Sequence, residues 1–287
     1  MADVRNSTNK RQRVVMLAAL FVMLAFALFF FSKVSTGAAD DNNELCHVYF
    51  KASGITTDDV SKVLIDGNRA TIGKSGKFII SGTGVGQIVV DTLDTQDMEI
   101  TMQNLNLTCE YDAPFLVRTS GDVVLIADGD NFLSDSSADT DDEIRVKACL
   151  YSKSDLKLIG DGSLTVDGHY HHGISVRGDM YTELEMLNVT APANAIDVND
   201  SIILAGGHVN LLAKGDGINA VNADDAKKGS VSIVGGTISI DAGDEGIQAD
   251  TEISVKGGRT SIKSSGDLFK CDGSMDIDND LVTAVLE

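Results

Sequence analysis

The chain has 287 residues, and its 23 lysines and arginines are outnumbered by 43 aspartates and glutamates, which gives a formal charge of −20. This charge argues against a nucleic-acid partner, because nucleic-acid-binding surfaces are basic. The composition, 43% hydrophobic with 28 glycines and no tryptophan, excludes disorder over most of the chain. Many short strands joined by tight turns suit such a composition, so we expect an all-β protein.

An uninterrupted apolar run, Val14–Phe31, lies between basic residues near the N-terminus. At 1.5 Å per residue it crosses most of a bilayer core of about 30 Å. Basic residues before the run and acids after it predict a cytoplasmic tail at 1–13, a transmembrane anchor or signal segment at 14–31 and a linker at 32–45. Small residues after the run leave cleavage by signal peptidase open. The domain at 46–287 is then exported, as part of a single-pass protein of the cell membrane or as a secreted protein.

A repeat of 22 residues runs through the second half of the chain. Its markers are short motifs that mostly end in Gly-Ile, and they follow one another at steps of 22, 22, 29 and 22 residues. The long step contains a polar stretch at 220–228, which we expect to be a loop. Each unit holds about three short strands, which predicts a single-stranded right-handed parallel β-helix of roughly ten coils. The markers are His172-Gly173-Ile174, Asn194-Ala195-Ile196, Asp216-Gly217-Ile218, Glu245-Gly246-Ile247 and Asp267-Leu268-Phe269.

Equivalent residues of stacked coils form columns, and two of these columns are apolar and should point inward. Cys149 and Cys271 also fall at inward positions, which indicates small buried thiols. The first column is Ile174, Ile196, Ile218, Ile247 and Phe269, and the second is Val176, Val198, Ala220, Ala249 and Cys271.

Several blocks of the sequence, in this order, resemble a bacterial family of exported carbohydrate-binding domains. The resemblance covers roughly residues 58 to 280. It implies a fold similar to that of pectate lyases, binding of cellulose and acidic sugars, bound calcium, and binding rather than cleavage. The blocks are Gly76–Gly82, Gly86–Asp91, Ala127–Asn131, Leu133–Asp135 and Asp155–Val166.

A column of polar residues precedes the first apolar column and predicts a cation site. Two bare carboxylates about 4.8 Å apart repel each other by roughly 3 kcal/mol at an effective dielectric constant near 20. A calcium ion would relieve this repulsion, since it binds six to eight oxygen atoms. The alternative is a solvated acidic edge. The candidate metal ligands are Asn194, Asp216, Asp244, Glu245 and Asp267.

Two other polar stretches are open to more than one interpretation. The acidic stretch at 135–143 lacks EF-hand spacing, so we expect a solvated loop, with cation binding as the alternative. The stretch 169–172 predicts either a plain turn, a sugar contact or a metal site. The candidate sugar-contacting residues are Tyr170, His171 and Tyr181.

The resulting hypothesis is a surface-displayed or secreted, non-catalytic polysaccharide-binding protein that calcium stabilises. Its partner would be a cellulose-like or acidic glycan, and the N-terminal helix would bring it to the membrane. A lyase needs a base beside its cation, and neither Arg177 nor Arg259 falls beside the acidic column. A self-assembling structural or adhesive surface protein is the main alternative, and a polysaccharide lyase is the other.

Overall fold

The computed structural model describes residues 45–93, 96–137 and 145–285. The regular elements of these residues are strands, apart from one 3-10 turn, η2 (Asn279–Leu281). The predicted tail and membrane-spanning segment lie outside the described residues. No helix in the described part of the chain is long and apolar enough to cross a membrane.

Ten strands lie side by side in one sheet, which we call the first sheet. Strands β3 and β4 form an antiparallel hairpin, and every later neighbour is parallel. Each strand thus pairs with its counterpart in the next coil. The ten strands are β3 (Val63–Asp66), β4 (Arg69–Ile72), β6 (Gln87–Asp91), β8 (Phe115–Thr119), β11 (Ala148–Ser152), β13 (His172–Val176), β15 (Ile196–Val198), β18 (Ile218–Ala220), β21 (Ile247–Ala249) and β24 (Phe269–Cys271).

A sixteen-stranded sheet supplies the two other faces of each coil. Its long strands take part in both faces, as when the first part of β12 pairs with β9 and its last part with β10. The long strands are β5 (Gly76–Val85), β7 (Met98–Thr108), β12 (Leu156–Asp167) and β14 (Met180–Ala191). The second face continues through β9 (Val123–Asp128), β16 (Ser201–Leu204), β19 (Ser230–Ile233), β22 (Glu252–Val255) and β25 (Ser274–Ile277). The third continues through β10 (Asp130–Ser134), β17 (His208–Ala213), β20 (Thr237–Ala242), β23 (Arg259–Ser264) and β26 (Val282–Ala284). Strands β1 (Cys46–Lys51) and β2 (Gly54–Thr57) pair antiparallel at the start of this sheet.

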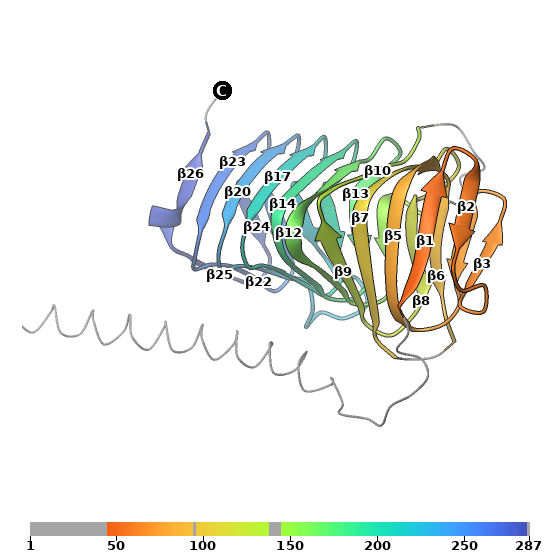
Figure 1. Cartoon of the computed structure of the whole chain (residues 1–287). Helices are drawn as coiled ribbons and strands as arrows, with labels where there is room; N and C mark the ends of the chain where they lie inside the picture. The colour runs from red at the N-terminus through yellow and green to blue at the C-terminus, as the bar shows by residue number, and fades with distance from the viewer. Residues whose placement is uncertain (1–44, 94–95, 138–144, 286–287) are drawn as a thin grey trace, which may run out of the picture. The chain divides into compact units, whose positions relative to one another are not determined.

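The strand register confirms the 22-residue repeat, and Figure 1 shows the coils stacked from β1 to β26. Ile174, Ile196 and Ile218 pair in succession and are fully buried. Ile247 continues the column and is equally buried, but Phe269 is only half-buried. Its strand β24 is the last of the first sheet, so one side of the ring lacks a covering coil among the described residues.

The structure also shows where the predicted loop and the predicted buried thiols lie. β18 ends at Ala220 and β19 begins at Ser230, so the polar stretch leaves the coil as a loop. Cys149 is fully buried, whereas Cys271 in the last coil is only half-buried. All four cysteines are free.

The acidic stretch at 135–143 is not a wholly solvated loop, because its first residue is buried. Asp135 Oδ2 lies 3.1 Å from a guanidinium nitrogen of Arg145, and the two side chains are 0% and 1% exposed. Asp135 also accepts a hydrogen bond from the amide of His169 at 2.6 Å. The prediction was wrong for Asp135 because its cationic partner lies outside the acidic stretch. Residues 138–144 lie outside the described part of the chain.

Candidate metal centre and its surroundings

The polar column at the start of the first-sheet strands is a ladder of hydrogen bonds. The imidazole of His172 accepts from the amide of Asn194 at 3.3 Å, and Asn194 Oδ1 accepts from the amide of Asp216 at 3.0 Å. Asp216 Oδ1 accepts from the amide of Glu245 at 3.1 Å. Each side chain thus satisfies a turn N–H of the next coil, which would otherwise be short of a partner. A structural role therefore accounts for the column even without a metal.

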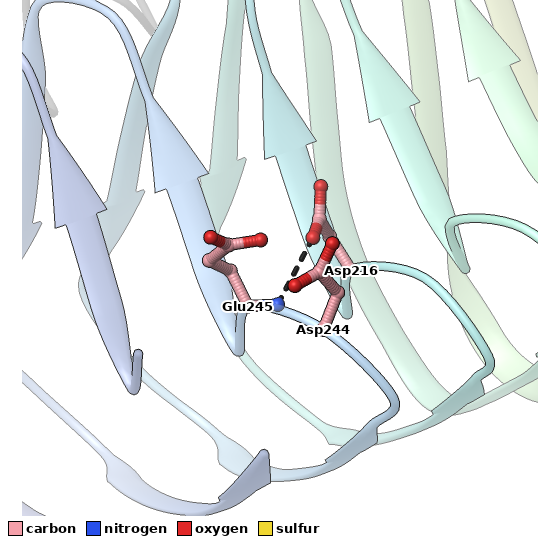
Figure 2. Close-up of side chains that lie close together, drawn as sticks. All are labelled: Asp216, Asp244 and Glu245. Atoms are coloured by element: carbon pink, nitrogen blue, oxygen red, sulfur yellow. Dashed lines mark hydrogen bonds between the residues drawn. The ribbon is translucent and has the colours of Figure 1, made fainter. Parts of the chain in front are cut away.

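Three carboxylates gather where this ladder reaches β18 and β21 (Figure 2). One oxygen from each of Asp216, Asp244 and Glu245 lies within 4.8 Å of the other two, and we call this group the carboxylate cluster. Asp216 is 8% exposed, whereas Asp244 lies on the surface. Turns of two successive coils place the three side chains. Asp267, one coil further on, is exposed and lies outside the cluster.

The cluster perturbs the protonation of its members. Burial raises the pKa of Asp216 to about 6, and its hydrogen bond with Glu245 acts in the same direction. The hydrogen bond with Glu245 also raises the pKa of Asp244. The pKa of Glu245 is lowered, chiefly because Lys270 donates a hydrogen bond to it. Two of the three carboxyl groups are therefore held in a site that disfavours their charged forms.

Lys270 is a member of the site that the sequence analysis missed. Its Nζ lies 2.8 Å from Glu245 Oε1, and its side chain is 46% exposed. Lys270 pairs in register with Gln248 on β21, so it belongs to the coil after Glu245. A search for basic residues one coil away from the acidic column would have found it.

The carboxylate cluster fits a calcium ion by the chemistry of its donors. Asp216, Asp244 and Glu245 offer hard carboxylate oxygens that Ca²⁺ prefers, and water would complete a shell of six to eight. Asn194 is a weaker candidate, since its Oδ1 already accepts the Asp216 amide. Of the five predicted ligands, the structure brings three together.

The three predicted sugar-contacting residues do not form one platform. Tyr170 and His171 precede β13, whereas Tyr181 follows it, and a five-residue strand separates the two positions by about 16 Å. Arg145 covers one face of the Tyr170 ring at 3.9 Å from the ring centroid. The hydroxyl of Tyr181 donates to Glu183 at 2.7 Å. Both rings therefore already have polar partners.

Comparison with known proteins shows where this chain belongs. The family described as "Carbohydrate-binding domain-containing protein" matches residues 66–280, nearly the whole coil. The chain belongs to this carbohydrate-binding-domain family. A protein of the same description from Acetivibrio thermocellus is 30% identical over 253 residues, which are 86% of each chain. A solved structure described as a polysaccharide lyase-like protein from C. thermocellum, in a gadolinium derivative, is similar to 84% of this chain with a TM-score of 0.79 and 27% identity, and all of that chain is covered.

In this member of the family, the outward side of the first sheet carries a second polar group. A guanidinium nitrogen of Arg177 donates to Asn199 Oδ1 at 2.8 Å and lies 4.0 Å from Asp197 Oδ2. Asp197 also accepts from Asn219 Nδ2 at 2.8 Å. His172 Nε2 lies 3.9 Å from Asp197, but burial lowers the pKa of His172 to about 4, so near neutral pH this contact is not an ion pair. Arg177 thus has an acidic neighbour, although not in the carboxylate cluster.

A second acidic column, also missed from the sequence, lies at the turns before the second face. Asp155 Oδ1 accepts from the amide of Asp179 at 2.8 Å, and Asp179 Oδ1 accepts from the hydroxyl of Ser201 at 2.6 Å. Burial raises the pKa of both aspartates. Lys228, at the end of the inserted loop, lies 2.6 Å from Asp200 at the top of this column. The available signal was an aspartate directly before each of four strands of this face, β9, β12, β14 and β16.

Proposed function

We propose that this protein binds polysaccharide at the cell surface without cleaving it. The observation that carries this proposal is membership of the carbohydrate-binding-domain family over nearly the whole coil. The coil offers long columns of polar side chains at intervals of about 4.8 Å, a suitable surface for an extended polymer. We also propose that the coil is right-handed, since crossovers between parallel strands are right-handed in about 98% of cases.

We propose further that calcium stabilises the domain through Asp216, Asp244 and Glu245. Two observations support this: the three carboxylates converge on one point, and burial raises the pKa of Asp216 to about 6. Bound calcium would supply positive charge that offsets the repulsion among the carboxylates.

Surface display is proposed from the apolar run Val14–Phe31 and the basic residues before it. If the run is retained, the coil is tethered to the cell membrane. If it is cleaved, the coil is released outside the cell. Mass measurement of the mature protein separates these two outcomes.

One experiment tests the binding proposal. The full-length protein is incubated with insoluble cellulose and with immobilised polygalacturonate, with calcium or with chelator, and the bound fraction and any released sugar are measured. We expect retention on glycan without product. Failure to bind any plant or microbial polysaccharide would contradict the proposal. Light scattering of the same sample tests the structural alternative, which expects self-association without glycan retention.

A lyase is the second candidate, and the position of Arg177 is the observation that favours it. Arg177 lies 4.0 Å from Asp197 on the outward side of the first sheet, where a basic side chain and a carboxylate could face one substrate. Unsaturated products that disappear in Arg177→Gln but persist in Arg259→Gln would establish this activity. Absence of such products with polygalacturonate and calcium supports binding alone.

A further inference from the structure

Charge is unevenly distributed along the coil. Residues 45–77, which form the strands from β1 to β4 and the start of β5, contain five lysines and arginines against three aspartates. Residues 78–287 contain 13 lysines and arginines against 36 aspartates and glutamates. We call residues 45–77 the cap, because their two antiparallel hairpins end the stack on the side opposite β26 (Figure 1). The cap is thus slightly positive in a strongly negative domain.

Large apolar side chains are exposed on the cap. Val60, in the turn that leads into β3, is 83% exposed, and Leu64 on β3 is 67% exposed. β3 is the last strand of the first sheet at this end, so no further coil covers it among the described residues. Leu45, directly before β1, is 43% exposed. Apolar side chains that gather at one end of a molecule, unlike single scattered ones, indicate a contact surface.

Two cations of the cap face solvent. Lys74, between β4 and β5, is exposed and has no ion-pair or hydrogen-bond partner among the described residues. Lys51, at the end of β1, is also exposed, and its ammonium group lies 5.2 Å from the centre of the Tyr49 ring. The other three basic residues already have polar partners within the protein: Lys62, Arg69 and Lys77.

An anionic bilayer surface repels the later coils but not the cap. The potential of such a surface falls off within a Debye length of about 8–10 Å, so it acts mainly on the part of a protein that lies closest. Contact through the later coils would bring many carboxylates into this layer. Contact through the cap brings in Lys51 and Lys74 instead. It also lets Val60 and Leu64 enter the interface, as apolar side chains do in peripheral membrane segments.

The cap also follows the apolar run closely in the sequence. Thirteen residues, 32–44, separate Phe31 from Leu45, and a fully extended chain of that length spans at most about 45 Å. If the run is retained in the bilayer, as proposed above, the start of β1 stays within that reach of the membrane surface. The length of the connection keeps the domain near the bilayer, and the uneven charge favours the cap as the part that touches it.

We propose that the cap rests on the anionic surface of the bilayer, with Val60 and Leu64 as its apolar contacts and Lys51 and Lys74 as its contacts to lipid phosphate. The coil then stands upright, with its late coils away from the lipid. The inference rests on the proposed retention of the apolar run and goes beyond it, because it assigns a second, separate membrane contact to the folded domain. An upright coil leaves the carboxylate cluster and the outward side of the first sheet accessible to polysaccharide.

The test uses the absence of tryptophan from the chain, since a single introduced tryptophan then reports only its own surroundings. Leu64→Trp places this probe on the cap, and Val60→Trp gives a second probe there. Leu212→Trp, at a leucine 52% exposed on β17, is the matched control in the late coils. Each full-length variant is reconstituted into phosphatidylcholine vesicles with or without phosphatidylglycerol. Tryptophan emission and its quenching by brominated lipid are measured at low and high salt, and circular dichroism checks the fold.

We expect a blue shift and bromolipid quenching for the probe at position 64 in vesicles that contain phosphatidylglycerol, and neither for the probe at 212. Both signals should weaken in phosphatidylcholine alone and at high salt, because the electrostatic attraction is lost. Lys51→Gln with Lys74→Gln, added to Leu64→Trp, should reduce the quenching. Lys214→Gln with Lys227→Gln, which removes the same charge from exposed lysines of later coils, should leave it unchanged.

Two results would overturn the membrane contact of the cap. One is equal quenching of the cap probes and the probe at 212, and the other is no quenching of either cap probe in vesicles that retain the protein. Failure of the unmodified full-length protein to float with either kind of vesicle would instead overturn the proposed membrane retention.

Discussion

The two ends of the first sheet carry opposite surfaces on one outward column. In the early coils Val89 and Leu116 occupy this column, are 1% exposed, and pack with Ala113 in a second apolar cluster. In later coils the same column carries Ser175 and then Asp197. The early coils thus place apolar side chains on the outward side of the sheet, whereas the later coils place hydrogen-bonding groups there, which are buried at Ser175 and Asp197 and half-buried at Asn219 and Gln248.

The same repeated coil can therefore carry either an apolar or a polar outward side. Early coils also hold the largest core side chains, Phe50, Phe78 and Phe115, and begin with two antiparallel hairpins. The late coils have cores of smaller side chains, and the carboxylate cluster lies at their turns. Five predictions test this contrast, and the one with the greatest expected change comes first.

The inward column should be intolerant of charge where coils cover it. Ile218→Asp should unfold the domain, because an unpaired buried carboxylate costs several kcal/mol. The matched change Ile277→Asp, in the half-covered last coil, should leave a folded protein. Circular dichroism and thermal melting compare the two. Equal damage from both would show that the last coil is as essential as the middle.

The buried ion pair should hold the junction between the two regions. Arg145→Met leaves Asp135 without its cation at 0% side-chain exposure, which should destabilise the protein by about 3–5 kcal/mol. The double change with Asp135→Leu should recover much of this loss. Urea denaturation measures both, and no recovery would mean that Arg145 acts through contacts other than Asp135.

The outer apolar cluster should contribute to stability only in the early coils. Leu116→Ala should cost about 2–5 kcal/mol, because the side chain is 1% exposed. Leu212→Ala, at a leucine 52% exposed in the late coils, should change stability by less than about 0.5 kcal/mol. Denaturant titrations measure the loss in free energy of unfolding for each variant. Similar losses for the two would contradict the difference between early and late coils.

Calcium should stabilise the late coils. A free ligand concentration of 100 times the dissociation constant stabilises a folded state by about 2.7 kcal/mol. Chelation should therefore lower the Tm, and added Ca²⁺ should restore it. Asp216→Asn with Glu245→Gln should abolish the response, since it removes two ligands and their repulsion. An unchanged Tm in chelator would exclude bound structural calcium.

Without calcium, the pH should affect the late coils through Asp216. Its pKa is raised to about 6 in the folded protein, against about 3.9 when unfolded. The folded state therefore holds a proton that the unfolded state releases. This stabilisation is complete below about pH 4 and is lost as the pH rises to about 6.

The comparison that isolates this effect is Asp216→Asn in chelator. The unmodified protein should lose stability relative to this variant between about pH 4 and 6. Parallel stability curves would show that Asp216 titrates normally.

Much of the coil could be predicted because the amino-acid sequence repeats with the same period as the coils. Stacked parallel strands put equivalent residues in register, so a 22-residue spacing of isoleucines predicts both the strands and the inward column. Ile174 and Ile196 pair as this spacing requires. The column ends imperfectly at Phe269 because a repeat does not say what covers its last unit.

The site was only partly predictable. The same spacing aligned Asn194, Asp216, Glu245 and Asp267, and Asp244 was added as the neighbour of Glu245. Three of these five candidate ligands, Asp216, Asp244 and Glu245, lie together in the structure. It could not separate Asp267 from the others, since the direction of a turn side chain depends on local backbone geometry. Lys270 was not predicted, because the spacing of acidic residues does not indicate which basic residue lies beside them.

The β composition, the coil length, the position of the inserted loop and the residues that face the core could all be predicted from the amino-acid sequence. These features follow from periodicity, which is a local and repeated property. The contacts of Lys270 with Glu245 and of Arg145 with Asp135, and a cleft over Ala213, become visible only in the folded chain. Such contacts join residues from different turns, and their distances depend on how the chain bends between strands, which no period encodes.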